Sequence, residues 1–238
     1  MVKAINILEL IEAVSEGGFK LNIATLPLTK ARAYAEAEFE KAGKDLNKEI
    51  PNFDKNYIEL QKACKKAIDI PRKEMPVIEP KDFPKFKDDL GKGQVDIFAP
   101  YAKGKLFTPK GLEKNKKAAD EWIVLGFKDN HPTDDKIKAI ITREAANKLL
   151  PSQSQIWLEK LVGNIIKFGL PITGSSVTEA TVISSSDGYI LDGHHRYGQA
   201  MLANPGVGMK TLVVPVDVKT LIKVGRSYGN ALGNKQKA

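Results

Sequence analysis

The run Asp-Gly-His-His-Arg at residues 192–196 brings a carboxylate, two imidazoles and a guanidinium together. It follows the apolar run 189–191 and precedes residues 197–203, which have the composition of a short helix. This order predicts a strand that delivers a polar loop to a helix N-terminus. Main-chain N–H groups and the positive end of the helix dipole converge there, so the position suits phosphate. Arg196 can hold two phosphate oxygens at once, and Gly193 lets a ligand approach the main chain.

Asp192, His194 and His195 are the candidate catalytic residues, because a carboxylate and two imidazoles can act as base, acid or metal ligand. Adjacent residues of a helix project about 100° apart, so the two histidines are poorly placed to chelate one metal ion together. His131 is the only other histidine, which argues against a zinc site. A Mg²⁺ ion that accompanies a nucleotide needs fewer protein ligands, and Asp192 is its candidate ligand.

The sequence bears on two alternative interpretations of this run, a P-loop enzyme and a corner with a purely structural role. The chain has no Gly-X-X-X-X-Gly-Lys-Ser/Thr loop, which excludes a P-loop enzyme. A purely structural interpretation stays open, in which Asp192 caps the helix, Arg196 pairs with an acid and the histidines are incidental. Against it, so many titratable side chains would be costly to gather merely for a turn.

The run resembles the nucleotide-binding box of the ParB/sulfiredoxin superfamily. Asp-Gly-His-His-Arg is similar to the box of the free-serine kinase branch and of uncharacterised phage-encoded ParB-like proteins. The likeness extends from about Pro151 to about Val216, over an amphipathic helix, a Gly-Leu-Pro-Ile connection, a hairpin, the box, a helix and a final strand. It implies a ParB/sulfiredoxin-like domain that binds a nucleotide.

By this resemblance, His194, His195 and Arg196 hold the phosphates of ATP or another nucleotide, beside Gly193. Asp192 acts at the acceptor hydroxyl or organises Mg²⁺. Phosphoryl transfer asks mainly for positioning and charge neutralisation, which such a cluster can supply.

Two further features of the relatives have candidate counterparts. An early acidic or amide residue precedes their long helix, and Ser152 and Gln153 are its expected counterparts, as additional nucleotide contacts. The kinases also use an early glutamate as general base, for which Glu144, Glu159 and Glu179 are the candidates here.

The sequence departs from two other branches of the superfamily. Sulfiredoxins carry a reactive cysteine where this chain has His194, which argues against sulfinic-acid reduction. Partition-type ParB proteins have a Gly-Glu-Arg-Arg box, whose glutamate and first arginine are replaced here by His194 and His195. This difference argues against cytidine-nucleotide switching.

Apolar spacing predicts three helices in a Lys-rich N-terminal region, residues 1–70. They are expected over residues 1–20, 29–42 and 53–68, with lysines on their solvated faces. The only cysteine, Cys64, excludes an internal disulfide and is expected to face the core.

Prolines and lysines dominate residues 71–130, which are expected to pack on the core. Five prolines between residues 71 and 100 predict extended loops and short strands, with a hairpin over 91–98. Residues 101–118 are lysine-rich, and solvation explains them better than a nucleic-acid groove. The run 122–127 fits either a strand or a helix.

The nucleotide-binding domain is expected over residues 131–218. The sequence predicts a strand at 137–141, a helix from Thr142, and a helix that Ser152 or Ser154 caps and that ends near Phe168. Two β-rich runs around an Asp-Gly tip predict a hairpin that aims residues 192–196. A last strand covers 211–216, and Pro215 favours an edge position for it.

The net charge of +8 favours polyanionic partners. Residues 219–238 carry five basic residues and no acid, which fits either a solvated tail with one helical turn near Leu221 or a nucleic-acid-binding arm. In the second case Lys219, Lys223 and Arg226 are the candidate contacts.

No apolar run approaches the roughly 20 residues of a membrane span, and the N-terminus has the pattern of an amphipathic helix rather than a signal peptide. We therefore expect no membrane partner and a cytoplasmic location, in a host cytoplasm if the chain is phage-encoded.

The sequence thus predicts an α+β protein with a ParB/sulfiredoxin-like domain, a small mixed sheet and a helical N-terminal region. The expected function is nucleotide binding coupled to phosphoryl transfer, as a kinase, or to nucleotide hydrolysis, as an ATPase. Alternatives are a DNA-binding or nuclease-type ParB-like protein and a phage-type factor that binds a host protein.

Overall fold

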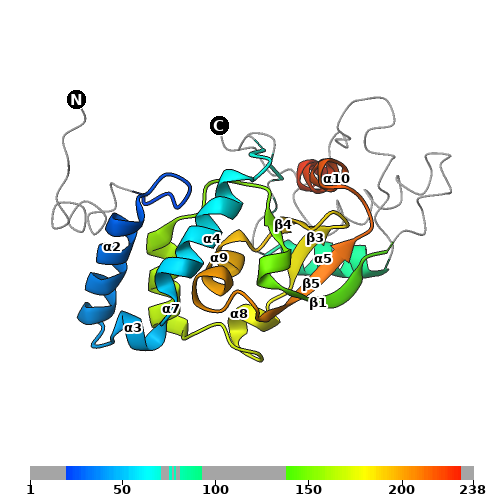
Figure 1. The fold of residues 1–238 in the computed structure, drawn as a ribbon. Helices are drawn as coiled ribbons and strands as arrows, with labels where there is room; N and C mark the ends of the chain where they lie inside the picture. Colours follow the sequence, from blue (N-terminus) through cyan, green and yellow to red (C-terminus); the bar gives the residue numbers. More distant parts are fainter. Residues whose placement is uncertain (1–19, 71–74, 77, 79–80, 93–137, 232–238) are drawn as a thin grey trace, which may run out of the picture. The chain divides into compact units, whose positions relative to one another are not determined.

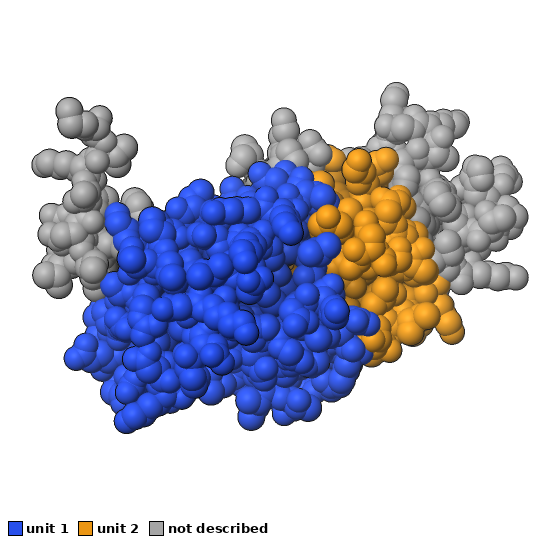
Figure 2. Space-filling view, in the orientation of Figure 1, with its two compact units in different colours: residues 1–69, 143–181, 193–210 blue, residues 70–142, 182–192, 211–238 orange. Residues whose placement is uncertain are grey.

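A computed structural model describes residues 20–70, 75–76, 78, 81–92 and 138–231. Within these residues the protein is a mixed α+β fold, as expected, with a five-stranded mixed sheet in the order β1-β5-β3-β4-β2 (Figure 1). The chain divides into two compact units, each built from three separate segments. Unit 1 comprises 1–69, 143–181 and 193–210, and unit 2 comprises 70–142, 182–192 and 211–238 (Figure 2).

Unit 1 is built around α9, a helix that is buried over most of its length. Figure 1 shows α9 alongside α4 and α7, both of which it contacts. Tyr197, Ala200 and Leu202 of α9 are fully buried, so this helix supplies the centre of the unit's core. The helices are α2 (Leu28–Lys41), α3 (Leu46–Glu49), α4 (Phe53–Lys65), α7 (Leu158–Phe168), α8 (Ser176–Glu179) and α9 (His194–Ala203).

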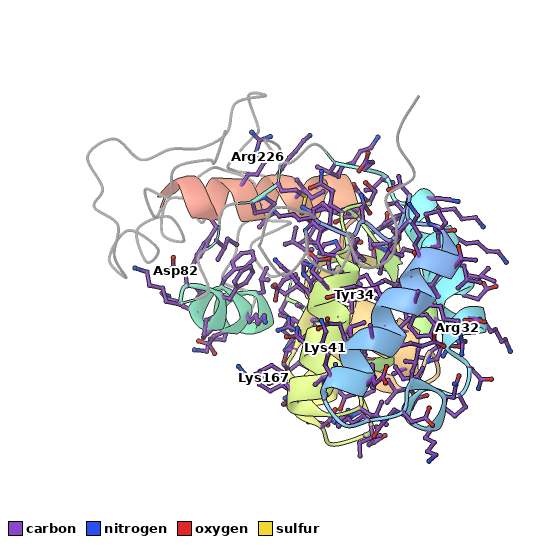
Figure 3. All side chains as sticks on the ribbon, turned by 90° about the vertical axis from the view of Figure 1, so that its left-hand side faces the viewer. Arg32, Tyr34, Lys41, Asp82, Lys167 and Arg226 are labelled. Atoms are coloured by element: carbon purple, nitrogen blue, oxygen red, sulfur yellow. The ribbon has the colours of Figure 1, made fainter. Side chains whose placement is uncertain are left out.

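The helices α2 and α4 confirm two of the predicted N-terminal helices. Tyr34 of α2 is buried, and Figure 3 shows it on a different side of α2 from Arg32. Arg32 Nη1 donates to Asp54 Oδ1 of α4 at 2.8 Å, and its Nε pairs with Glu36. Cys64 faces the core as predicted, and burial raises the pKa of its thiol to about 12.

The predicted hairpin is present and leads directly into α9. Strand β3 (Val182–Ser185) pairs antiparallel with β4 (Tyr189–Asp192), and Gly188 in the intervening turn has φ 83°. Strand β3 also pairs in parallel with β5 (Gly208–Val214), with Val182 opposite Thr211. The remaining strands are β1 (Ile140–Ala145) and β2 (Leu150–Pro151), separated by a short 3-10 helix at Ala146–Lys148.

Unit 2 packs two helices around the apolar side chains of β3, β4 and β5. These helices are α5 (Phe83–Lys92) and α10 (Val218–Ala231). They meet through Phe86 and Tyr228, whose ring centroids are 4.7 Å apart. The core of this unit includes Ile183, Leu191, Leu212, Val214, Leu221, Val224 and both rings.

The loops and strands predicted for residues 71–100 are wrong for residues 83–92, which form α5, whereas residues 75–76, 78 and 81–82 lie outside helices and strands. Phe83, Phe86 and Leu90 recur at helical spacing and face the core. Pro84 is compatible because it lies in the first turn, where its missing N–H breaks no helical hydrogen bond. Gly91 and Lys92, where the predicted hairpin would begin, are the last two residues of this helix, and the rest of that hairpin lies outside the described residues.

Two predicted helix starts are also wrong. Thr142, Arg143 and Glu144 lie in strand β1 instead of capping a helix. The helix α7 begins at Leu158 after Trp157, which makes no side-chain cap, so neither Ser152 nor Ser154 caps it. Both serines are engaged elsewhere.

Two expectations for the C-terminal segment require correction. Strand β5 lies between β1 and β3 and is not an edge strand. Pro215 follows its last residue, so the missing N–H does not interrupt the pairing. The single turn expected near Leu221 is a helix of 14 residues, since its apolar side chains complete the core of unit 2.

Several predictions concern residues outside the described ranges. These are the helix at 1–20, the lysine-rich run 101–118, the segment 122–127 and His131. Within the described residues, no helix is both long enough and apolar enough to cross a membrane.

Gly198→Ala should destabilise the protein by about 1–3 kcal/mol, because overpacking a full core forces side chains to shift. An added Cβ would lie 2.9 Å from Leu161 Cδ1 and 3.1 Å from Ile156 Cγ2, both fully buried. Gly163→Ala, at an exposed position of α7, is the matched control, since nothing lies within 4 Å of the added Cβ and helix propensity favours alanine. Urea denaturation measures both, and equal effects would contradict the packing of α9 on α7.

Candidate functional site

The run 192–196 forms the junction between β4 and the first turn of α9. The helix begins at His194, directly after Gly193, so the histidines and Arg196 belong to the helix itself and not to a loop before it. Gly193 adopts φ 107°, a left-handed conformation that side chains other than glycine rarely tolerate. The Tyr197 N–H donates to the Gly193 carbonyl at 2.8 Å and closes the first turn.

His194 points into the protein and is held by Ser152. Its Nε2 accepts from the Ser152 main-chain N–H at 3.2 Å and lies 3.0 Å from Ser152 Oγ. A main-chain N–H can only donate, so Nε2 is unprotonated and Nδ1 carries the proton of the neutral ring. Ser152 is fully buried and His194 is 8% exposed. Both residues therefore position the first turn through the contacts of His194 Nε2 with the Ser152 N–H and hydroxyl.

His195 is partly exposed, but its Nε2 is buried and has no hydrogen-bond partner within the described chain. Burial, and then the nearby positive charge of Lys160, lower the pKa of His195 to about 4. The ring is therefore neutral near pH 7 and can offer one N–H or one lone pair to a ligand.

Gln199 lies one turn after His195 on the same side of α9. Its Nε2 donates to the His195 carbonyl at 3.2 Å, so the amide folds back along the first turn. Gln199 is 3% exposed, and its Oε1 has no partner among the described residues. Gln199 is not among the residues that the sequence singled out, although its spacing of four from His195 is a signal that could have indicated it.

Arg196, in the first turn of α9, is partly exposed. Its Nη2 donates to the Thr181 main-chain carbonyl at 3.4 Å.

Asp192 is held by a residue that the sequence analysis did not single out. Its Oδ2 lies 3.2 Å from Lys87 Nζ of α5, and both side chains are 22% exposed. The charge expected to bind Mg²⁺ is therefore already balanced within unit 2. No spacing in the sequence relates these two residues, which are more than 100 positions apart.

The loop after β2 is fixed by a second contact besides the one to His194. Ser154 Oγ donates to Asp69 Oδ1 at 2.6 Å. Asp69 follows α4 and has φ 48°, a strained conformation for a residue with a side chain. Gln153, between the two anchored serines, is partly buried.

Two of the candidate general bases have structural partners. Glu179 accepts two hydrogen bonds from Arg143 at 2.5 and 2.7 Å, and this pairing lowers the pKa of the Glu179 carboxyl. Glu159 Oε2 accepts from the Leu21 N–H at 3.1 Å. Glu144 lies in β1 and is partly exposed.

The described residues contain no group of three or more His, Cys, Asp or Glu side chains that could hold a metal ion.

The run Gly225 to Gly229 matches the Gly-X-Ser-X-Gly pattern of hydrolases. A nucleophile elbow requires a sharp turn between a strand and a helix, whereas all five of these residues lie inside α10. The match therefore gives no support to a serine hydrolase.

Comparison with known proteins gives no relative for this chain: no protein-family model, no curated protein and no solved structure matches it. The candidate site rests on its own geometry.

His194→Phe should lower the free energy of unfolding by about 1–3 kcal/mol, because the buried Ser152 N–H loses its acceptor. Ser152→Ala keeps the N–H and its bond to Nε2, so it should cost less. Chemical denaturation at neutral pH compares the two. A larger loss for Ser152→Ala would show that the hydroxyl, not the N–H, makes the important contact.

The pKa of His195 predicts a pH dependence of stability. The unfolded chain binds a proton near pH 6.5, and the folded chain binds it only near pH 4. Stability should therefore be full above pH 6.5, fall by roughly 1–3 kcal/mol as the pH drops through this window, and level off below it. The difference between the wild type and His195→Gln isolates this residue, and two parallel curves would contradict the assignment.

Proposed function

We propose that the first turn of α9 binds the phosphates of a nucleotide, and that the protein transfers or hydrolyses the terminal phosphoryl group. The observation that carries this proposal is the uncompensated positive end of α9. Its first turn contains no acidic residue, and its N-cap, Gly193, has no side chain to cap it. The residues that follow are His194, His195 and Arg196.

The charge pattern of α9 opposes its helix dipole. Acidic side chains stabilise a helix N-terminus by about 0.3–1 kcal/mol, and cations there are unfavourable. An arginine in this turn, close to N–H groups that have no intrahelical acceptor, therefore favours an anionic ligand. A cationic Arg196 and a neutral His195 suit phosphate oxygens. They suit a metal ion less well, because the turn lacks carboxylates.

Two buried polar atoms of α9 also support the proposal. His195 Nε2 and Gln199 Oε1 are buried without partners within the described chain. Leaving such groups unpaired costs about 1–3 kcal/mol each, so a site usually supplies a partner. A hydroxyl group of the ligand, or a water that it retains, would supply such a partner.

The proposal assigns different roles to the residues of the run. The main-chain N–H groups of residues 193–196, with Arg196, contact phosphate, and His195 contributes a neutral ring. His194 and Ser152 are positioning residues that fix the orientation of the turn. Asp192, which immediately precedes Gly193, would act at the acceptor hydroxyl or on Mg²⁺ once it exchanges Lys87 for that partner.

The order of elements supports the ParB/sulfiredoxin-like fold as part of this proposal. The chain runs from the hairpin β3–β4 through Gly193 into α9 and then into β5, which pairs in parallel with β3. Ligands of mixed sheets with such crossovers commonly bind where a strand ends and the following helix begins.

A thermal-shift screen of ATP, ADP, CTP and GTP with Mg²⁺ tests the binding. At a ligand concentration of about 100 times Kd, the folded state gains about 2.7 kcal/mol. We expect one nucleotide to raise Tm clearly in the wild type and to have no effect on Arg196→Gln.

Lys55→Gln is the matched control, since it removes one exposed positive charge from the same unit and should keep the shift. Asp192→Asn should keep binding and lose phosphate release or transfer. A wild-type protein that ignores all four nucleotides, or a shift that survives Arg196→Gln, would refute the proposal.

A further inference from the structure

Asp69 adopts a backbone conformation that residues with a side chain rarely adopt. Its φ of 48° is the only positive φ of a residue other than glycine within the described ranges. The left-handed region crowds Cβ against the main chain, although aspartate and asparagine accept it more readily than other residues. Glycine would adopt it without strain. The fold therefore keeps a strained residue here, which indicates that the carboxylate itself is needed.

The Asp69 carboxylate holds the loop that follows strand β2. Its Oδ1 accepts from Ser154 Oγ at 2.6 Å and from the Ser154 main-chain N–H at 3.4 Å. The two residues are 85 positions apart, so the contact joins the segment after α4 to a distant part of the chain. Helix α4 contacts both β2 and α9. Asp69 thus ties the loop to the helix that packs beside α9.

The same loop carries the residue that orients the first turn of α9. The Ser152 main-chain N–H and hydroxyl contact His194 Nε2 at 3.2 and 3.0 Å. Ser152 and Ser154 are two residues apart, and two residues span at most about 7 Å of chain. A shift of Ser154 is therefore transmitted to Ser152, because the chain between them has little slack.

Main-chain bonds keep the rest of this loop folded. The Ile156 N–H donates to the Ser154 carbonyl at 3.1 Å, and the Ile156 carbonyl accepts from the Ile23 N–H at 3.0 Å. These bonds do not involve Asp69. Removal of its carboxylate should therefore leave the loop folded and change only where Ser154 and Ser152 lie.

We propose that Asp69 is a positioning residue of the nucleotide site. Through Ser154 it places the Ser152 N–H against His194 Nε2, and this contact sets the rotation of the first turn of α9. The inference rests on the proposed function of that turn. All the residues in this series of contacts belong to unit 1.

The test compares Asp69→Gly with Asp69→Asn in the full chain. Both variants remove the same negative charge, but asparagine keeps an acceptor oxygen for Ser154 and tolerates the left-handed φ. Glycine removes the acceptor together with the strain. The first measurement is hydrogen exchange of the Ser152 amide without ligand, which reports local opening of its bond to His194. The second is the Kd for inorganic triphosphate.

In Asp69→Gly we expect the Ser152 amide to exchange about tenfold faster and the Kd to rise about tenfold, the factor for one lost hydrogen bond to a charged group. The amides inside α7 should keep their exchange rates. Asp69→Asn should stay within about threefold of the wild type, because a neutral acceptor is only slightly weaker. Loss of an acid should by itself strengthen the binding of an anion, so weaker binding cannot come from charge.

Ser154→Ala removes the hydroxyl donor of the same contact and should act in the same direction. The double variant Asp69→Gly, Ser154→Ala should be no worse than the more affected single variant, since both changes break one interaction. Asp45→Gly is the control. It removes another acid of unit 1, whose side chain caps α3, and should leave both measurements unchanged.

Unchanged Ser152 exchange or unchanged triphosphate binding in Asp69→Gly would overturn the positioning role and leave the proposed function intact. Equal effects of Asp69→Gly and Asp69→Asn, or effects that add in the double variant, would overturn it as well. A wild-type protein that binds no triphosphate would contradict the proposed function, and the positioning role would fall with it.

Discussion

The hydrogen bond from the Ser152 main-chain N–H to His194 Nε2 determines how the first turn of α9 faces its surroundings. It holds one imidazole inside unit 1 and fixes the rotation of the helix about its axis. Successive side chains of a helix differ by about 100°, so anchoring His194 turns His195 and Arg196 toward other sides. The left-handed Gly193 allows the chain to pass from β4 directly into the helix. The phosphate proposal depends on both constraints.

The same rotation explains why a dense run of charged residues separates into distinct environments. His194 is buried and bonded, His195 is largely buried and neutral, and Arg196 keeps a partly exposed charge. Asp192, one residue before the glycine, is balanced by Lys87. This run of five residues thus places anchored and partly exposed side chains next to one another, and the burial of each side chain, not its type, distinguishes them.

Patterns that depend on local spacing could be read from the sequence. The helices α2 and α4, the Asp-Gly hairpin and the helix after Gly193 follow from apolar periodicity and turn chemistry. Long-range contacts could not be predicted in this way. Lys87 contacts Asp192 from α5, where the prolines had led to a prediction of loops, and Ser152 contacts His194 across 42 residues. The length of helix α10 was underestimated because its apolar side chains are stabilised by packing in the core of unit 2, which the sequence does not reveal.

The central claim is that an anion binds at the main-chain N–H groups of the first turn of α9. The most direct measurement is a titration of ¹⁵N-labelled protein with inorganic triphosphate, followed by the amide resonances of residues 193–196. The account predicts that these amide protons shift downfield together and saturate, and that they stay in place in Arg196→Gln. Saturating shifts confined to other residues, or no shift at residues 193–196, would contradict it.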